Sequence, residues 1–182
     1  IQVRNAARRG SRGLQEASDA ALSSLVVPAC DTIASYPGQL MPQQRAMVMF
    51  SCGVLRCFHA PLLKRVGDEV AACSWQEIGS TQQLANMLHG LAMLYERGGG
   101  SGPLPHEGAA KNLARLFHQH AVTAGMKPME LASSVWSLAK MGLLDLTALA
   151  PALTERRVME VRGLGSQEAV TILFALGSKQ LY

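Results

Sequence analysis

The sequence predicts an all-α fold, an α-solenoid of stacked antiparallel helix pairs with a period of 38–39 residues. The first observation behind this prediction is a segment that recurs along the chain with the same order of small, apolar and ring-bearing residues. The second is the spacing of its apolar residues, which return every three or four positions, as on one buried face of a helix. The third is the composition: aromatic residues make up only 5%, while Ala, Leu, Gly and Met are abundant, which favours closely packed helices over a β-sandwich.

The recurring segment starts at four positions. "PQQRAMVMFSCGVL" begins at Pro42, "TQQLANMLHGLAML" at Thr81, "PMELASSVWSLAKM" at Pro128 and "SQEAVTILFALG" at Ser166, so the intervals are 39, 47 and 38 residues. The long interval contains the Gly/Pro-rich insertion "GGGSGPLPHEG" at 98–108. Removing about nine residues of this insertion restores the period, which indicates an array of repeats.

Each copy combines a helix-start signal with a buried face. Pro at the first helical position and Glu or Gln at the third favour a helix start, and Ser80 with Gln83 is typical of a capping box. Matching positions of the copies form columns, and four columns should be buried between units. They hold a small residue where helices approach closely (Ala46, Ala85, Ala132, Val170), an apolar residue (Met49, Leu88, Val135, Leu173), a bulky ring at the edge of the core (Phe50, His89, Trp136, Phe174) and a last, mostly aliphatic residue (Cys52, Leu91, Leu138, Leu176).

Second helices are expected after the first three copies, over residues 60–74, 109–125 and 145–159. The predicted organisation is a basic flexible arm at 1–13 followed by the array at 14–182. The array comprises a partial unit 14–41, repeats 42–80, 81–127 and 128–165, and a partial repeat 166–182. Pro28 should kink or end the helix of the first partial unit. Neither end has a polar cap, so we expect a longer array or ends that are docked on other molecules.

Charge is distributed unevenly along the chain. The formal net charge is +4, and the first fifteen residues carry Arg4, Arg8, Arg9 and Arg12 before any acidic residue. Such an arm, flanked by Gly10 and Gly13, is typical of a segment that binds an anionic partner, although an ordinary solvated end has the same composition.

No catalytic set, metal site or cofactor motif emerges from the sequence. The four cysteines show no C-x-x-C pattern, and His118 and His120 are two residues apart, so they lie on different sides of a helix. The Gly-rich stretch is not followed by G-K-[ST], which a phosphate-binding loop requires. No apolar run of about 18 residues exists to span a membrane. We therefore expect no enzymatic activity, no small-molecule substrate, no cofactor and no membrane partner.

The segments "QQLANMLHGLAML" and "MELASSVWSLAKMG" resemble the octotricopeptide repeat, a helix pair of organelle RNA-binding proteins of green algae, and the related FAST-kinase-like helical repeats. The shared pattern is Q/E-x-L-A-x-x-x-W-x-L-A-K, nearly complete at 130–140, good at 83–92 and recognisable at 168–176. The copy at 44–53 departs most, with Arg45, Met49 and Cys52. The resemblance covers roughly residues 40–182 and implies RNA binding in a mitochondrion or chloroplast.

The array offers two kinds of candidate RNA contacts. The column after the small residue carries Asn86, Ser133 and Thr171, a variable polar set suited to reading one base per repeat. Cations on the second helices, together with the basic arm, are candidates for phosphate contacts. They are Lys64, Arg65, Lys111, Arg115, Arg156 and Arg157. Each of these residues is equally compatible with a solvated helix face.

Three helix pairs read too little sequence to find one transcript unaided. The sequence therefore favours a structural subunit of the mitochondrial ribosome that binds ribosomal RNA beside neighbouring ribonucleoprotein subunits, with the chloroplast as the alternative location. The other hypotheses are a free RNA maturation, stability or translation factor and a protein–protein scaffold.

Overall fold

The computed structural model describes residues 24–120, 125–149 and 165–179. Contacts within the chain divide it into two units, residues 1–37 and 38–182, and each is described by itself. In the first unit, residues 24–35 are helical. Pro28 does not end this helix, and its carbonyl accepts a hydrogen bond from the Thr32 hydroxyl at 2.8 Å.

The described residues form helices and loops with no strand among them, so the predicted all-α class is confirmed for this part of the chain. In the second unit the helices are α2 (Pro42–Val54), α3 (Ala60–Ala72), α4 (Trp75–Ile78), α5 (Thr81–Arg97), α6 (Glu107–His120), α7 (Pro128–Lys140) and α10 (Ser166–Lys179). Residues 146–149 are also helical. Helices α2, α5, α7 and α10 begin at the four residues where the sequence copies start.

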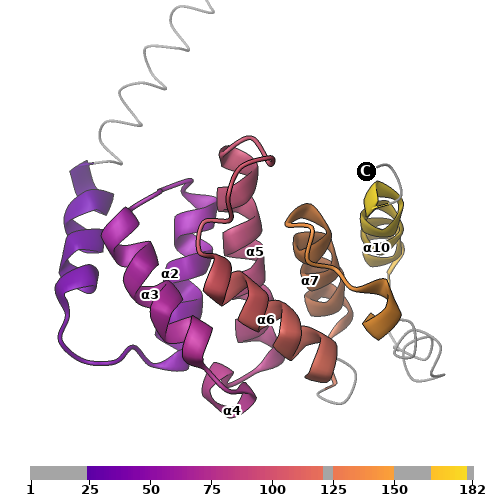
Figure 1. The fold of residues 1–182 in the computed structure, drawn as a ribbon, viewed down its shortest axis with the longest axis horizontal. Coiled ribbons are helices and arrows are strands. Elements are labelled where there is room, and N and C mark those ends of the chain that lie inside the picture. The colour runs from indigo at the N-terminus through magenta and orange to yellow at the C-terminus, as the bar shows by residue number, and fades with distance from the viewer. Residues whose placement is uncertain (1–23, 121–124, 150–164, 180–182) are drawn as a thin grey trace, which may run out of the picture. The chain divides into compact units, whose positions relative to one another are not determined.

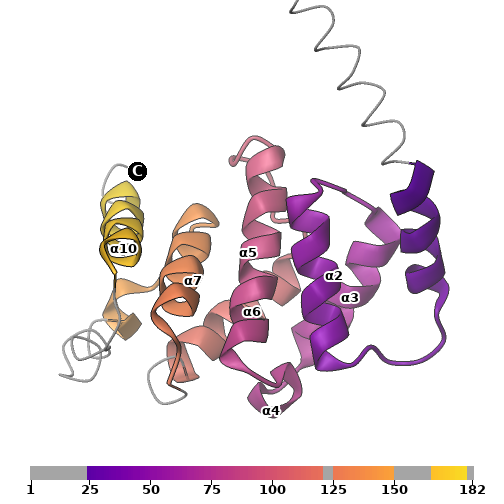
Figure 2. The same cartoon turned by 180° about the vertical axis from the view of Figure 1, so that it is seen from behind.

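The helices of the second unit pack in two rows. Helix α2 packs against α5, α5 against α7 and α7 against α10, so these four helices lie side by side in chain order (Figure 1). Helices α3 and α6 pack against each other and against α2 and α5, respectively. Figure 2 shows the same two rows from behind.

Helices α2 and α5 meet backbone to backbone at two glycines. A Cβ placed on Gly53 would lie 2.6 Å from the Gly90 Cα, and a Cβ on Gly90 would lie 2.2 Å from the Met49 carbonyl oxygen. No side chain fits at either position. The matching positions at the next two interfaces also hold small residues, which are Ala92 opposite Ser137 and Ala139 opposite Ala175. At the α2–α5 interface a backbone contact therefore falls at Gly53 and Gly90, in addition to the buried small residues of the Ala46 column.

In the first three copies the columns of small, apolar and aliphatic residues are buried as predicted, but the ring column is wrong, since Phe50 is exposed and His89 and Trp136 are only partly buried. In the fourth copy the prediction is wrong for three of the four columns. Ala46, Met49, Leu88, Leu91, Val135 and Leu138 are all at least 96% buried. In contrast, Val170 and Leu173 of α10 are 63% and 67% exposed. Within the described residues, α10 packs against α7 and buries Ala175. Val170 and Leu173 lie outside this buried face of α10. Trp136 is only partly buried, so its truncation should destabilise the fold less than the loss of a core tryptophan.

Helices α2, α5 and α7 share the same hydrogen-bonded C-terminus. In α7, the Leu143 N–H donates to the Leu138 carbonyl at 2.8 Å and the Gly142 N–H to the Ala139 carbonyl at 3.1 Å, with Gly142 at φ 69°. This is the Schellman arrangement, which needs a left-handed residue and usually takes glycine. In α2 the left-handed position is occupied by Arg56, at φ 52°.

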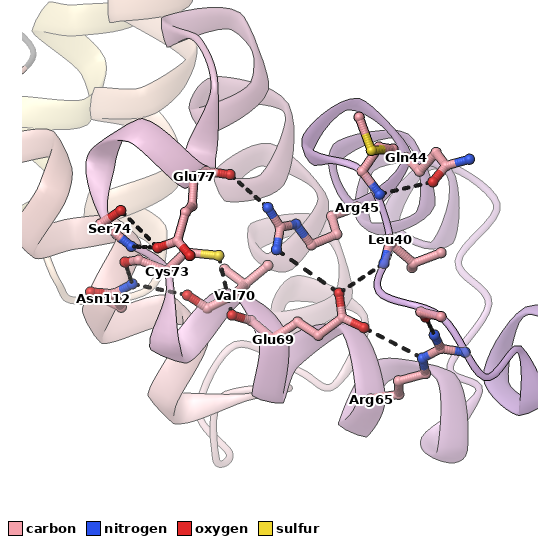
Figure 3. Close-up of polar contacts among 12 residues, drawn as sticks. Leu40, Gln44, Arg45, Arg65, Glu69, Val70, Cys73, Ser74, Glu77 and Asn112 are labelled. Carbon is pink, nitrogen blue, oxygen red and sulfur yellow. Dashed lines mark hydrogen bonds and ion pairs between the residues drawn. The ribbon is translucent and has the colours of Figure 1, made fainter.

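Polar contacts around Glu69 join α2, α3 and the loop before α2 (Figure 3). The Glu69 carboxylate accepts a hydrogen bond from the Leu40 N–H at 3.3 Å and pairs with Arg65 at 3.5 Å and Arg45 at 3.9 Å. Arg45 is 7% exposed and donates to the Glu77 carbonyl oxygen at 2.6 Å. Its column holds Leu84 and Leu131 in the next copies, so α2 replaces an apolar contact by a buried, paired charge.

Other elements differ from the sequence-based expectation at their ends. Helix α6 begins at Glu107, inside the segment expected to be an insertion, because the His106 Nδ1 accepts from the Ala109 N–H at 3.2 Å and caps the helix. The Ser80–Gln83 capping box is only half formed. Ser80 Oγ accepts from the Gln83 N–H at 3.2 Å, whereas Gln83 Oε1 has no hydrogen-bond partner among the described residues.

We predict that Gly90→Ala destabilises the fold by about 1–3 kcal/mol, the range for overpacking a filled core, because the new methyl group meets the α2 backbone. Urea unfolding followed by circular dichroism measures the change. Gly177→Ala on α10 is the matched control, since nothing lies within 4 Å of its Cβ position. The control should be neutral or gain up to about 1 kcal/mol from the better helix propensity of Ala. Equal effects of the two substitutions would contradict a backbone contact at Gly90.

We predict that Arg56→Gly raises the free energy of unfolding by about 0.5–1 kcal/mol. Relief of the left-handed strain of a non-glycine residue outweighs the greater freedom that glycine has in the unfolded chain. The reverse change at the equivalent residue, Gly142→Ala, should lower the free energy of unfolding by a similar amount. Chemical denaturation of both variants provides the comparison. If Arg56→Gly does not stabilise the fold and Gly142→Ala does not destabilise it, these positions are unstrained.

Candidate nucleic-acid interface

Three rings from three helices form a continuous row, here called the ring ladder: Phe50 of α2, His89 of α5 and Trp136 of α7. The ring centroids of Phe50 and His89 are 5.8 Å apart with planes inclined by 31°, and those of His89 and Trp136 are 5.5 Å apart with planes inclined by 37°. Phe50 is 37% exposed, and the other two rings are partly exposed. The ladder is therefore a row of aromatic surface that solvent can reach.

The close helix packing explains why these rings meet. The α2 atoms that touch Gly90 are the Met49 carbonyl and the Phe50 amide nitrogen, so each ring is attached next to the contact. At the following interface, Ser137 is completely buried and its hydroxyl donates to the Ser133 carbonyl at 2.7 Å. A hydroxyl satisfied within its own helix can be buried between helices without cost to its hydrogen bonding.

The predicted base-reading column runs beside the ring ladder. Asn86, Ser133 and Thr171 stand three residues before the ring of their own copy, and residues three apart share one face of a helix. Ser133 Oγ lies 3.4 Å from the His89 Nδ1 of the neighbouring helix. The Thr171 hydroxyl donates to the Gln167 carbonyl at 2.8 Å, which leaves its oxygen lone pairs to accept.

A pocket of about 280 Å³ opens between α7 and α10, beside the ladder. This α7–α10 pocket is bounded by the rings of His89 and Trp136, the hydroxyls of Ser133 and Thr171, and the side chains of Gln167 and Glu168. It brings together two of the three predicted base-reading residues. Asn86 is half-buried and is not part of its lining.

The predicted cations of α3 and α6 are engaged with neighbouring acids or amides. Lys64 pairs with Asp68 at 2.7 Å and Lys111 with Glu107 at 2.5 Å. These lysines lower the pKa of both carboxyl groups through direct hydrogen bonds. The other two cations also have partners: Arg115 donates to Gln119 and Asn112, and Arg65 binds Glu69 and the Gly38 carbonyl oxygen. Lys64, Lys111 and Arg115 are exposed, whereas Arg65 is partly buried in the cluster around Glu69.

The remaining predicted cations lie outside the described residues. They are Arg4, Arg8, Arg9 and Arg12 of the arm and Arg156 and Arg157. Their phosphate contacts stay predictions.

One further cation lies at the ladder itself. The Lys140 Nζ is 5.7 Å from the centroid of the Trp136 ring, within the range of a cation–π contact, and 3.0 Å from Glu96 Oε1. Burial lowers the pKa of His89, so its imidazole is neutral near pH 7 and serves as a flat, weakly polar ring.

Other ring-bearing and thiol side chains of the described residues also have structural partners. Trp75 stacks on His120, with centroids 5.0 Å apart, and His118 Nε2 accepts from the Asp145 N–H at 3.1 Å. The Cys73 thiol lies 3.2 Å from the Glu69 carbonyl, and burial raises its pKa. Among the described residues, no three His, Cys, Asp or Glu side chains gather as a metal site. None of the helices in the described segments has the length and apolar character needed to traverse a bilayer.

Sequence reasoning found the ring column but assigned it to the edge of the core. It did not predict that Phe50, His89 and Trp136 form a row that solvent can reach. It also did not predict that Gln167 and Glu168 line the pocket. A signal was present, because a polar residue lies three positions before the ring in three of the four copies. No protein-family model, curated protein or solved structure matches this chain.

We predict that His89 makes stability depend on pH. Its folded pKa lies below the ordinary value of 6.5, so below that value the unfolded chain binds a proton more readily than the folded chain. The His89 contribution is therefore complete above about pH 6.5 and declines as the pH falls through this value. Urea unfolding between about pH 7.5 and 5 should show a shallower acid decline for His89→Phe than for the unmodified chain.

His120→Phe is the matched control for this measurement. It also replaces a stacked imidazole by a stacked phenyl ring, but away from the ladder. The control should retain the His89-dependent part of the decline, and identical pH profiles for the unmodified chain and His89→Phe would refute the prediction.

Proposed function

We propose that this chain is an RNA-binding α-solenoid, built from helix pairs with a 38–39-residue period, and that it holds ribosomal RNA as a structural subunit of an organelle ribosome, most simply the mitochondrial one. The observation that carries the RNA-binding proposal is the solvent-accessible ring ladder beside a column of hydroxyl and amide side chains. Proteins that hold single-stranded nucleic acid combine such stacking surfaces with cations and polar side chains.

The dimensions of the ladder support this proposal. Three successive first helices each contribute one ring, and neighbouring centroids lie within 6 Å. An unpaired strand crossing these helices would find an aromatic face at each step, with hydroxyl or amide groups beside it. Stacking accepts every base, whereas the polar groups can distinguish base edges.

Among the described residues, Lys140 is the cation that lies at the ladder. This sparse positive charge favours the binding of a single strand over that of a duplex. The formal net charge is +4, and Lys140 lies next to Trp136 while also paired with Glu96. Phosphate contacts from the predicted arm would add the salt-dependent part of the affinity. The ribosomal role rests on the resemblance of the copies to repeats of organelle RNA-binding proteins.

A protein–protein scaffold is the second candidate function, and one feature of α2 favours it. Met47, Phe50 and Val54 are exposed by 58%, 37% and 50% and are spaced to share one side of the helix. An apolar surface of this kind suits a partner helix as well as nucleobases. The two functions differ in whether RNA is recovered with the protein.

We predict that Trp136→Ala weakens the binding of single-stranded RNA by about 1–3 kcal/mol, the usual contribution of one base–aromatic stack. Fluorescence anisotropy with a labelled single-stranded oligonucleotide measures the change. Trp75→Ala is the matched control, because Trp75 stacks on His120 outside the ladder. The control should retain its affinity even where it loses stability.

Crosslinking in the organism then separates the possible roles. Recovery of one ribosomal RNA segment supports the proposal, and recovery of messenger RNA supports a free maturation or translation factor. The scaffold becomes the better account if the full chain crosslinks to protein only and binds no oligonucleotide in solution.

A further inference from the structure

A glutamate occupies the third helical position of both α7 and α10, but only the glutamate of α7 has a hydroxyl donor at the matching position of the preceding first helix. At the α5–α7 interface, Glu130 Oε2 accepts a hydrogen bond from the Thr81 hydroxyl of α5 at 2.8 Å and from the Lys127 N–H at 3.1 Å. Glu168 of α10 occupies the matching position of the next copy. The residue of α7 that corresponds to Thr81 is Pro128, which has no hydroxyl to donate. Glu168 therefore lacks this donor from the neighbouring helix, and its side chain lines the α7–α10 pocket.

Two side chains of this pocket, Glu168 and Thr171, present hydrogen-bond acceptors. A carboxylate such as Glu168 can only accept. The Thr171 hydroxyl donates its hydrogen bond to the Gln167 carbonyl, so its oxygen lone pairs remain available to accept one. The Ser133 hydroxyl and the Gln167 amide can do either. Trp136 and His89 supply flat walls, so the pocket is complementary to a planar group whose edge carries N–H donors.

We propose that the α7–α10 pocket binds one nucleobase that carries an exocyclic amino group (adenine, cytosine or guanine) and discriminates against uracil. This inference rests on the proposed function and specifies which bases the α7–α10 pocket selects. The amino group would donate to Glu168 while the base lies against Trp136. Uracil has no amino group and offers a single ring N–H between two carbonyl oxygens, so a carboxylate that accepts from this N–H meets an acceptor on each side and is compensated less well for the water it loses.

The surrounding charges also fix the direction of the bound nucleotide. A carboxylate repels phosphate, so the backbone of the strand runs on the side of the pocket away from Glu168. Lys140 lies at the Trp136 ring, 5.7 Å from its centroid, and provides a cation beside the stacked base. The base edge faces α10, and the phosphate faces the open side of α7.

Labelled oligoadenylate, oligocytidylate and oligouridylate of equal length test the inference on the full chain. We expect the first two to bind at least about tenfold more tightly than oligouridylate, as for one hydrogen bond to a charged acceptor. Glu168→Gln should reduce this ratio several-fold, chiefly by improving the binding of oligouridylate, because an amide can donate to the uracil carbonyl. Gln occupies this position in α2 and α5, as Gln44 and Gln83, so the variant retains a natural helix start.

Glu130→Gln is the matched control, since it makes the same change in the same column at an interface where Thr81 already occupies the carboxylate. It should leave the ratio unchanged. Equal affinity of the unmodified chain for all three oligonucleotides would overturn the inference while leaving RNA binding in place. A ratio that survives Glu168→Gln would also overturn it, because the selection would then arise elsewhere. Failure to bind any of the three would overturn the proposed function itself.

Discussion

The contact between Gly53 and Gly90 determines the spacing on which the candidate interface depends. With no side chain between α2 and α5, the Met49 carbonyl and the Phe50 amide lie directly against Gly90. The ring that follows in α2 and the ring that precedes in α5 are thereby brought to 5.8 Å. A bulkier residue at the crossing would separate the helices and open the row of rings. The core packing and the candidate interface thus both depend on these two glycines.

At one position of α2 a buried charged side chain replaces an apolar one. Arg45 stands in a column that holds Leu84 and Leu131 in the next two copies, and its buried guanidinium is paired with the Glu77 carbonyl and the Glu69 carboxylate. A buried charge pair stabilises little beyond well-packed apolar residues, but removing one partner leaves an uncompensated charge. Glu69 also holds Arg65 and the loop before α2, so this cluster ties the start of α2 to α3.

Local patterns in the sequence predicted the helices well and their environments less well. Helix starts at Pro42, Thr81, Pro128 and Ser166 follow from residues within a few positions of each start, so they are readable from the chain alone. The exposure of Leu173 depends on what packs against the far side of α10, which no local pattern contains. Likewise, the difference between Glu130 and Glu168 arises from the residue that the previous helix places opposite each of them. Such contacts become visible only when the helices are side by side.

The loop between α5 and α6 has a practical consequence for handling this protein. The glycines at positions 99, 100 and 102 have nothing within 4 Å of their Cβ positions, and residues 97–103 are exposed. Loop closure depends weakly on length, since a doubling of length costs only about 0.6 kcal/mol. An epitope or an unnatural, photoreactive amino acid can therefore be inserted at Ser101 with little strain. An epitope at this site would serve as a purification handle and leave both chain termini unaltered.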